Sequence, residues 1–346
     1  MSNFHLLSNW GWQPFFQQQL ALDDWDSCIA ARIINQHRNE IVLATGTATI
    51  PMPLTPSLPS MVVGDWILLD HNQRLVRLLD RKTQFVRKAS GTKVSTQLIA
   101  ANVDTVFIVC SMNADFNLSR IERFLALVNE AGAEPVIVLS KRDQTDIPDR
   151  FVSQVQALDP LLSVEAINGL DIDSVQQLSP WLKPGKTVAV LGSSGVGKST
   201  LINTLSGDTV QMTQGIREND AKGRHTTTSR ALLPLASGSL ILDTPGMREL
   251  QLADCAEGIS KTFADIDTLA MGCRYADCHH EDEPGCRVLE AIQEGTLAQR
   301  RLENYQKLQR EERLNSATLA QRRASDKTFG KFIKRTQGEA KTLKGR

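Results

Sequence analysis

A short glycine-rich run can bind phosphate groups. Residues 192–200 match the pattern G-x-x-x-x-G-K-[ST], follow an apolar β-type run at 187–191, and precede a helix expected to open at Lys198. Lys198 would neutralise the terminal phosphates and Ser199 would offer its hydroxyl to Mg²⁺. An ordinary glycine-rich turn is the alternative, and the preceding strand argues against it. The predicted nucleotide contacts are Gly192, Ser193, Ser194, Gly195, Val196, Gly197, Lys198, Ser199 and Thr200.

A second motif lies downstream, where an apolar run at 240–242 ends in D-x-x-G. Asp243 is placed to hold Mg²⁺ through a water molecule, and Gly246 to contact the γ-phosphate. The same four-residue string also occurs in common turns. Its position after an apolar strand and a phosphate loop indicates a P-loop NTPase.

Residues 136–143 indicate which nucleotide base is bound. An apolar strand at 136–139 leads into Ser140, Lys141, Arg142 and Asp143, a run close to the N-K-x-D motif that recognises guanine. An Asp carboxylate accepts hydrogen bonds from N1–H and the exocyclic amine of guanine, whereas adenine presents an acceptor at N1. The pattern therefore favours GTP over ATP, with a solvated turn as the alternative. Ser140 replaces the Asn that normally braces the phosphate loop, so weaker nucleotide affinity is expected.

Between the phosphate loop and D-x-x-G lies Gly223-Arg-His-Thr-Thr-Thr228, where a first switch is expected. Thr228 is the preferred Mg²⁺ ligand, although Thr226 and Thr227 are not separable from it by sequence. Met247 stands where many signalling GTPases carry a water-orienting Gln, and a thioether cannot orient water in that way. His225 is the candidate for that task, and a solvated or RNA-binding histidine is the alternative.

The order of these motifs is unusual. The guanine element at 140–143 precedes the phosphate loop at 192–200 and the D-x-x-G at 243–246, whereas in ordinary GTPases the phosphate loop comes first. The sequence therefore predicts a circularly permuted GTPase domain. Permutation places the C-terminal part of the chain directly after the γ-phosphate switch, so that part is expected to respond to hydrolysis.

A cluster of Cys and His residues follows at 273–286. Cys273, Cys278 and Cys286 with one histidine, His279 or His280, provide four ligands for a closed tetrahedral Zn²⁺ site of structural type. A disulfide pair or reduced buried cysteines are the alternatives. The other three cysteines of the chain are scattered in apolar contexts, which favours a metal site.

With these motifs the chain resembles the ribosome small subunit-dependent GTPase A family of permuted GTPases that act late in small-subunit assembly. The resemblance covers nearly the whole chain and includes the strings at 63–66, 101–104 and 223–228. It implies His225 as the catalytic histidine and His280 as the fourth zinc ligand. It also implies the small ribosomal subunit and its rRNA as partners.

The N-terminal region is predicted to be β-rich, with short strands at 28–34, 40–44, 46–50, 65–70 and 75–79. Five short strands suit a small barrel of several possible types, and the resemblance favours an OB-type barrel. Basic residues at 81–88 could hold nucleic acid or form a solvated face. Residues 1–27 are expected to form a short helical or irregular arm.

The net charge of zero conceals an asymmetry, because residues 296–346 carry 14 Lys and Arg against 5 Asp and Glu, whereas the preceding residues carry 25 against 34. Helical spacing runs from Leu297 to Leu319, and 327–335 interleave basic and aromatic residues. This pattern suits rRNA phosphates and base stacking. A solvated helix with a disordered tail is the alternative.

Together these features predict a multidomain α/β protein: an arm at 1–27, an OB-like β-barrel at 28–90, a circularly permuted P-loop GTPase domain at 91–255, and a zinc-binding helical domain with a basic tail at 256–346. The resemblance further implies GTP hydrolysis stimulated by the small ribosomal subunit. No apolar run reaches the roughly twenty residues of a membrane span, so a cytoplasmic location is expected. The oligomeric state is open in the sequence, and a monomer is the default expectation. The rivals are a nucleotide-gated RNA-binding scaffold without turnover and an ATP-driven nucleic-acid enzyme.

Overall fold

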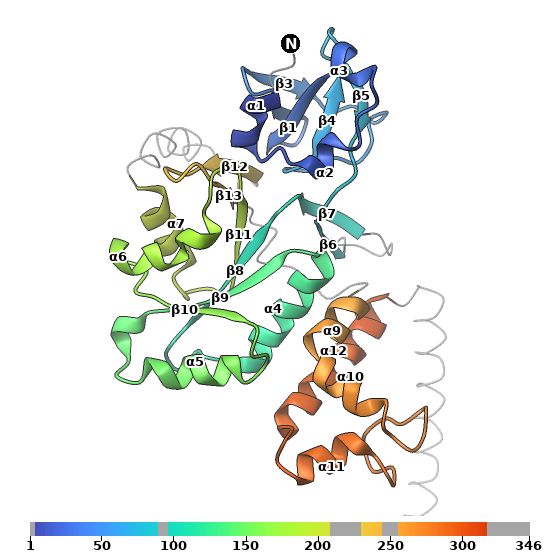
Figure 1. The fold of residues 1–346 in the computed structure, drawn as a ribbon, viewed down its shortest axis with the longest axis vertical. Helices are drawn as coiled ribbons and strands as arrows, with labels where there is room; N and C mark the ends of the chain where they lie inside the picture. The colour runs from blue at the N-terminus through green and yellow to red at the C-terminus, as the bar shows by residue number, and fades with distance from the viewer. Residues whose placement is uncertain (1–3, 89–95, 208–229, 244–254, 317–346) are drawn as a thin grey trace, which may run out of the picture.

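The computed structural model describes residues 4–88, 96–207, 230–243 and 255–316. Eleven strands form one mixed sheet whose main path runs β10-β9-β8-β11-β13-β12-β1-β2-β3, with β4 and β5 attached beside β1. Figure 1 shows the N-terminal strands at one end, the central α/β layers next to them, and the C-terminal helices beside α4. The sheet thus joins the N-terminal strands to the predicted nucleotide-binding part.

The central strands are parallel except for β12. Their apolar runs are buried on both faces, and β8 and β11 have no exposed residue. Continuous apolar strands are typical of parallel sheets that helices cover on both sides. The strands are β8 (Thr105–Ser111), β9 (Glu134–Ser140), β10 (Ser163–Ala166), β11 (Thr187–Leu191), β12 (Arg230–Pro234) and β13 (Leu240–Asp243).

Two groups of helices cover the two faces. Side chains of α4 and α5 share a core with Val106, Ile108 and Leu139, whereas side chains of α6, η3 and α7 share a second core with Phe107, Val109 and Val138. Alternate residues of each strand therefore face opposite layers. The helices are α4 (Leu118–Ala131), α5 (Pro148–Gln156), α6 (Ile172–Val175), η3 (Gln176–Trp181) and α7 (Lys198–Ser206).

The five expected N-terminal strands are present and pair in the order β3-β2-β1-β4-β5. The third strand begins later than predicted because residues 46–48 form a turn, in which Gly46 has φ +86° and Thr45 and Ala48 exchange hydrogen bonds. The strands are β1 (Ile29–Gln36), β2 (Glu40–Ala44), β3 (Thr49–Pro53), β4 (Trp66–Leu69) and β5 (Leu75–Leu78).

Residues that precede these strands form short helices, as expected. Leu7 and Phe16 from this segment pack on Trp66 and Leu68 of β4, and the edge of Trp12 meets the Trp66 ring. Aromatic burial therefore holds the segment on one face of the N-terminal strands. The helices are α1 (Phe4–Leu7), η1 (Ser8–Trp10), α2 (Pro14–Gln17) and α3 (Asp24–Ser27).

The N-terminal strands are joined to the central sheet at β12. Asn35 and Gln36 of β1 pair with Ala231 and Arg230, and the Arg230 guanidinium donates to the carbonyl oxygens of residues 98 and 99. Burial lowers the pKa of Arg230, with further repulsion from Arg87. Those carbonyls belong to the antiparallel pair β6 (Gln84–Lys88) and β7 (Thr96–Ala101). One arginine thus links three strand groups.

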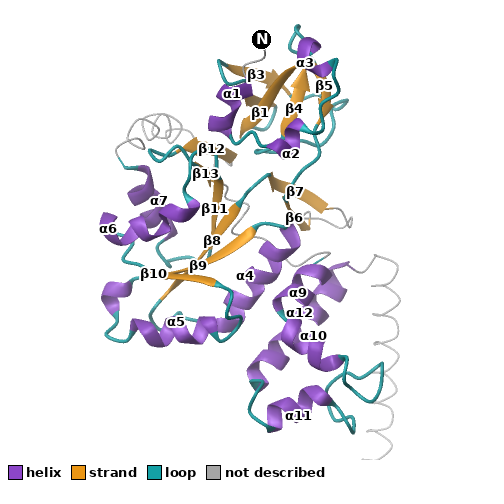
Figure 2. Ribbon diagram, in the orientation of Figure 1, coloured by secondary structure: helices purple, strands orange, loops and turns teal. Residues whose placement is uncertain are grey.

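The described C-terminal part is helical and packs against α4, as Figure 2 shows by its purple elements. Glu122 of α4 is fully buried, and its carboxylate accepts hydrogen bonds from Arg300, Arg301 and Asn304 at 2.6–3.0 Å. Arg301 also binds Asp265 and lies over Phe263. The helices are α9 (Ala256–Thr262), α10 (Ala264–Ala270), α11 (Arg287–Gln293) and α12 (Gln299–Ser316).

We predict that Glu122→Ala lowers the free energy of unfolding by about 3–5 kcal/mol, because it leaves the buried guanidinium of Arg301 and the amide of Asn304 without their shared acceptor. Urea unfolding followed by circular dichroism measures the change. Glu303→Ala is the matched control, since Glu303 is an exposed acid of α12 bonded to Gln299 of the same helix. Equal urea midpoints for the two variants would contradict the role given to Glu122.

Candidate functional site

Parallel strands bring the predicted motifs to one edge of the sheet. The phosphate loop follows β11, the residues 140–143 follow or end β9, and Asp243 ends β13. Because β9, β8, β11 and β13 run parallel, their carboxyl ends meet at the same edge (Figure 1). Ligands of open α/β sheets bind at this edge. The fold thus assembles segments that are up to about a hundred residues apart in the chain.

The phosphate loop is curled by its glycines. Gly192, Gly195 and Gly197 have φ values of +147°, +80° and +95°, and a Cβ on Gly192 would stand 2.3 Å from the carbonyl oxygen of Val109. Helix α7 begins directly after Gly197, at Lys198, as predicted. Glycine is required here because other residues rarely adopt this backbone. The loop therefore presents N–H groups at the start of a helix, which suits phosphate oxygens.

Lys198 is buried at the base of this loop, and its Nζ donates to the carbonyl oxygen of Ser193. Ser199, in the first turn of α7, is exposed. The buried thiol of Cys110 lies nearby, and burial raises its pKa to about 12. That thiol stays neutral at physiological pH, so it adds no negative charge beside the lysine.

A cavity of about 650 Å³ opens in front of the loop. One wall is formed by residues 192–195 and 197–200, and the facing wall by Arg120, Arg123 and Phe124 of α4. Three cations and no acid are among the described residues that line it. This lining suits a polyanion such as a triphosphate. The sequence did not single out the α4 residues, because only the chain topology places this helix opposite the loop.

Ser140 contacts the phosphate loop directly. Its hydroxyl donates to the carbonyl oxygen of Val196 at 2.6 Å, and it also lies 3.3 Å from the carbonyl oxygen of Cys110. The side chain is buried. Ser140 therefore supplies a brace to the loop in place of the usual Asn. Whether nucleotide affinity is weaker with this residue stays a prediction.

The candidate guanine side lies between the ends of β9 and β10. Lys141 adopts a left-handed backbone with φ +60°, the N–H of Arg142 donates to the carbonyl oxygen of Ile167, and Asp143 is exposed. The next loop is tied to α7 because the Thr204 hydroxyl donates to the carbonyl oxygen of Gly169 at 2.7 Å. Segment 140–143 and the loop at 167–169 thus flank one site.

Part of the predicted site lies outside the described residues. This applies to His225, Thr228 and Gly246, and for Asp243 only the backbone is described. The backbone of Asp243 pairs with Ala231 at the carboxyl end of β13, beside β11. Its strand position fits the predicted role near Mg²⁺.

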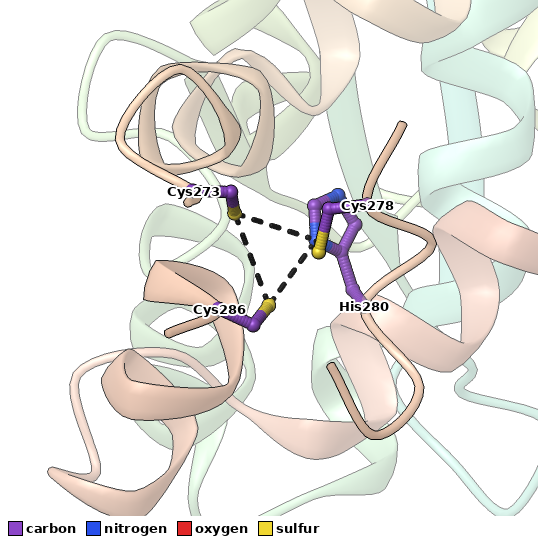
Figure 3. Close-up of side chains that lie close together, drawn as sticks. All are labelled: Cys273, Cys278, His280 and Cys286. Atoms are coloured by element: carbon purple, nitrogen blue, oxygen red, sulfur yellow. Dashed lines mark hydrogen bonds between the residues drawn. The ribbon is translucent and has the colours of Figure 1, made fainter. Parts of the chain in front are cut away.

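The cysteine and histidine cluster converges as predicted. In Figure 3 the side chains of Cys273, Cys278, His280 and Cys286 point toward one another, and one ligand atom of each lies within 4.8 Å of the others. Nδ1 of His280 is 3.3–3.7 Å from the three sulfurs, and the Cys273 and Cys286 sulfurs are 3.9 Å apart.

These separations fit a tetrahedral metal site. Ligands at about 2.3 Å for sulfur and about 2.0–2.1 Å for nitrogen would be about 3.8 Å apart for two sulfurs and about 3.6 Å apart for sulfur and nitrogen. His280 has a left-handed backbone with φ +60°, and Gly285 with φ +75° precedes the returning Cys286. His279 lies outside the cluster. The residues present can therefore hold one metal ion.

We predict that Ser140→Ala weakens GTP and GDP binding about tenfold, because the buried carbonyl of Val196 loses its donor and the loop loses a brace. Equilibrium fluorescence with labelled nucleotides measures the dissociation constants. Ser153→Ala is the control, since Ser153 is an exposed residue of α5 whose hydroxyl donates within its own helix. Unchanged affinity in Ser140→Ala would show that the loop keeps its shape without this bond.

Comparison with known proteins gives a consistent result. The RsgA GTPase family model matches residues 78–253. Small ribosomal subunit biogenesis GTPase RsgA 2 of Vibrio parahaemolyticus is 56% identical over 339 residues, which cover 98% of this chain and 95% of the relative. The RsgA protein of Xanthomonas campestris is 44% identical, with 94% and 93% covered.

Solved structures show the same architecture. YjeQ from Thermotoga maritima superposes with a TM-score of 0.60 at 27% identity, covering 81% of this chain and 97% of that one. YloQ, described as a circularly permuted GTPase, gives a TM-score of 0.59 at 23% identity, with 84% and 96% covered, and supports the fold. The predicted permutation and family resemblance are confirmed, and the chain belongs to the RsgA GTPase family.

Proposed function

We propose that this protein hydrolyses GTP to GDP and phosphate when it is bound to the small ribosomal subunit, and that it assists a late step of subunit maturation. The main support is that the phosphate loop, the guanine element and the end of β13 lie at one edge of the sheet, in the permuted order along the chain. The names of the relatives, small ribosomal subunit biogenesis GTPases, support the same function. Nucleotide state would control binding to rRNA and release from it.

The reaction is an in-line attack of water on the γ-phosphorus, which breaks the bond to the bridging oxygen and leaves GDP. The loop N–H groups and Lys198 offset charge on the phosphates. Ser199, Thr228 and Asp243 would hold Mg²⁺, which supplies further charge neutralisation when bound. We assign to His225 the positioning of the attacking water.

A single substitution tests the role assigned to His225. His225→Ala should lower ribosome-stimulated turnover and leave nucleotide affinity unchanged. Unchanged turnover would exclude the assignment.

The C-terminal helices offer a surface for RNA. Arg310 and Arg313 are exposed on α12 and line a cleft of about 390 Å³ beside His279 and the metal cluster. Guanidinium groups suit RNA phosphates. We propose that residues 256–346 form the rRNA-binding zinc domain, 28–90 the OB-like barrel and 91–255 the GTPase domain.

We also propose that the protein acts in the cytoplasm as a monomer. Its proposed partner, the small ribosomal subunit, is assembled there. In the described part of the chain, every helix is too short or too polar to cross a bilayer.

Phosphate release from GTP and from ATP, each with and without purified small subunits at one salt concentration, tests the function. We expect stimulation with GTP alone. Asp143→Asn should weaken GTP binding on the order of 100-fold, since the amide keeps only one acceptor oxygen and turns an N–H donor toward a donor of guanine. Asp146→Asn, an exposed acid of the same loop, is the control. A preference for ATP would overturn the guanine assignment, and nucleotide binding without stimulated turnover would leave a scaffold.

We further propose that the Cys₃His cluster holds one structural Zn²⁺ ion, because four protein ligands leave no open position for catalysis. Metal analysis should give one zinc per chain. Cys286→Ser should abolish it, whereas His279→Ala, which alters the neighbouring histidine, should retain it. Nucleotide affinity should survive in both variants. Equal zinc loss in the two variants would place His279 among the ligands and contradict the proposed ligand set.

A further inference from the structure

Helix α4 stands between the phosphate cavity and the C-terminal helices. Arg120, Arg123 and Phe124 line the cavity opposite the phosphate loop. The same helix contacts α12 through Glu122 and Arg123. Arg123 therefore faces both the candidate nucleotide site and the C-terminal part of the chain.

The contact between Arg123 and α12 is a fork of two hydrogen bonds. Its two terminal nitrogens donate to the two carboxylate oxygens of Glu311, each at 2.6 Å. The hydrogen bond from Arg123 lowers the pKa of Glu311, so this acid is ionised at neutral pH. The two side chains are 27% and 30% exposed. A partly exposed pair of this kind contributes little net stability and can be exchanged for another anion.

Arg120, the neighbouring cation of α4, has a different ion-pair partner. Arg120 pairs with Asp115, five residues earlier in the chain, at 2.8 Å. Its pairing connects α4 only to the turn that precedes it. Among the cavity-lining cations, Arg123 is thus the one with a described ion pair to the C-terminal helices.

A bound triphosphate would compete for Arg123. The described lining of the cavity contains no acid, so the terminal phosphate would bring concentrated negative charge in front of Arg123 and Lys198. A guanidinium binds phosphate in the same bidentate manner as carboxylate, and the phosphate carries the larger charge. Glu311 offers a single charge on a partly exposed helix.

We propose that Arg123 binds the terminal phosphate of GTP, and that this contact replaces its ion pair with Glu311. The inference rests on the proposed function, because it assigns the phosphate cavity to GTP. GDP lacks the third phosphate and leaves the ion pair in place. Arg123 then contacts the nucleotide. Its ion pair with Glu311 is present or absent according to which nucleotide is bound, so the contact between α4 and α12 depends on the nucleotide state.

The position of Glu311 on α12 determines which part of the helix is affected when Arg123 changes its partner. Glu122 holds the helix near its start, at Arg300, Arg301 and Asn304. Glu311 lies seven residues beyond Asn304, about 10 Å along the helix. Loss of the Arg123 contact would loosen the end of α12 beyond the buried Leu308 by the small amount that one partly exposed ion pair contributes, while the near part stays fixed. That far part leads into the basic residues proposed to contact rRNA.

The test compares Arg123→Gln with Glu311→Gln, because both remove the ion pair but only the first removes the cation from the cavity. Affinities for a non-hydrolysable GTP analogue and for GDP are measured with Mg²⁺. In Arg123→Gln we expect a roughly tenfold weaker analogue affinity and unchanged GDP affinity. In Glu311→Gln we expect analogue affinity equal to or above wild type. Equal losses in the two variants, or a loss shared by GDP, would overturn the proposal.

Hydrogen exchange gives an independent readout at residues 309–316, which follow the buried Leu308 of α12. In the wild type, the analogue should speed exchange there relative to GDP. In Arg123→Gln, exchange should be fast with both nucleotides, and the double variant should match Arg123→Gln in both assays. Exchange that is insensitive to nucleotide in the wild type would overturn the proposal. Failure of the wild type to bind GTP would instead refute the proposed function.

Discussion

A buried carboxylate ties the C-terminal helices to the nucleotide-binding sheet. Glu122 has no exposed surface, and an unpaired charge in that position would be strongly unfavourable, so two arginines and an amide of α12 must meet it. The pairing sets where α12 lies on α4, and the core continues from these helices to the apolar layer beneath the sheet. The α12 cleft and the Arg123 contact depend on that placement.

A second connection joins the central sheet to the N-terminal strands. Strand β12 belongs to the central sheet and pairs with β1, while Arg230 at its first position bonds to the β7 backbone. Backbone pairing transmits displacement because a strand cannot shift without breaking its neighbours' hydrogen bonds. The GTPase sheet is therefore attached to both flanking parts of the chain through its own elements.

The sequence predicted whatever depends on local pattern. The phosphate loop, the start of α7 at Lys198, the N-terminal strands and the Cys₃His cluster each combine residue type with short spacing, and the structure contains them. It did not predict that Arg123 faces the cavity or that Ser140 braces Val196, since both depend on packing between distant segments. Nor could spacing place β3 correctly, because the turn at Gly46 is set by its own backbone hydrogen bonds.

The permuted order of the motifs determines which flanking part of the chain follows each predicted switch. The segment 208–229, which carries the predicted first switch, connects α7 of the phosphate site to β12, which pairs with the N-terminal strands. The segment 244–254, with the predicted γ-phosphate contact, connects β13 to α9, which packs on α4. Each predicted switch is thus anchored at one end in the nucleotide site and at the other in an element that reaches a different flanking part. In this topology a change at the nucleotide site can act on both flanking parts.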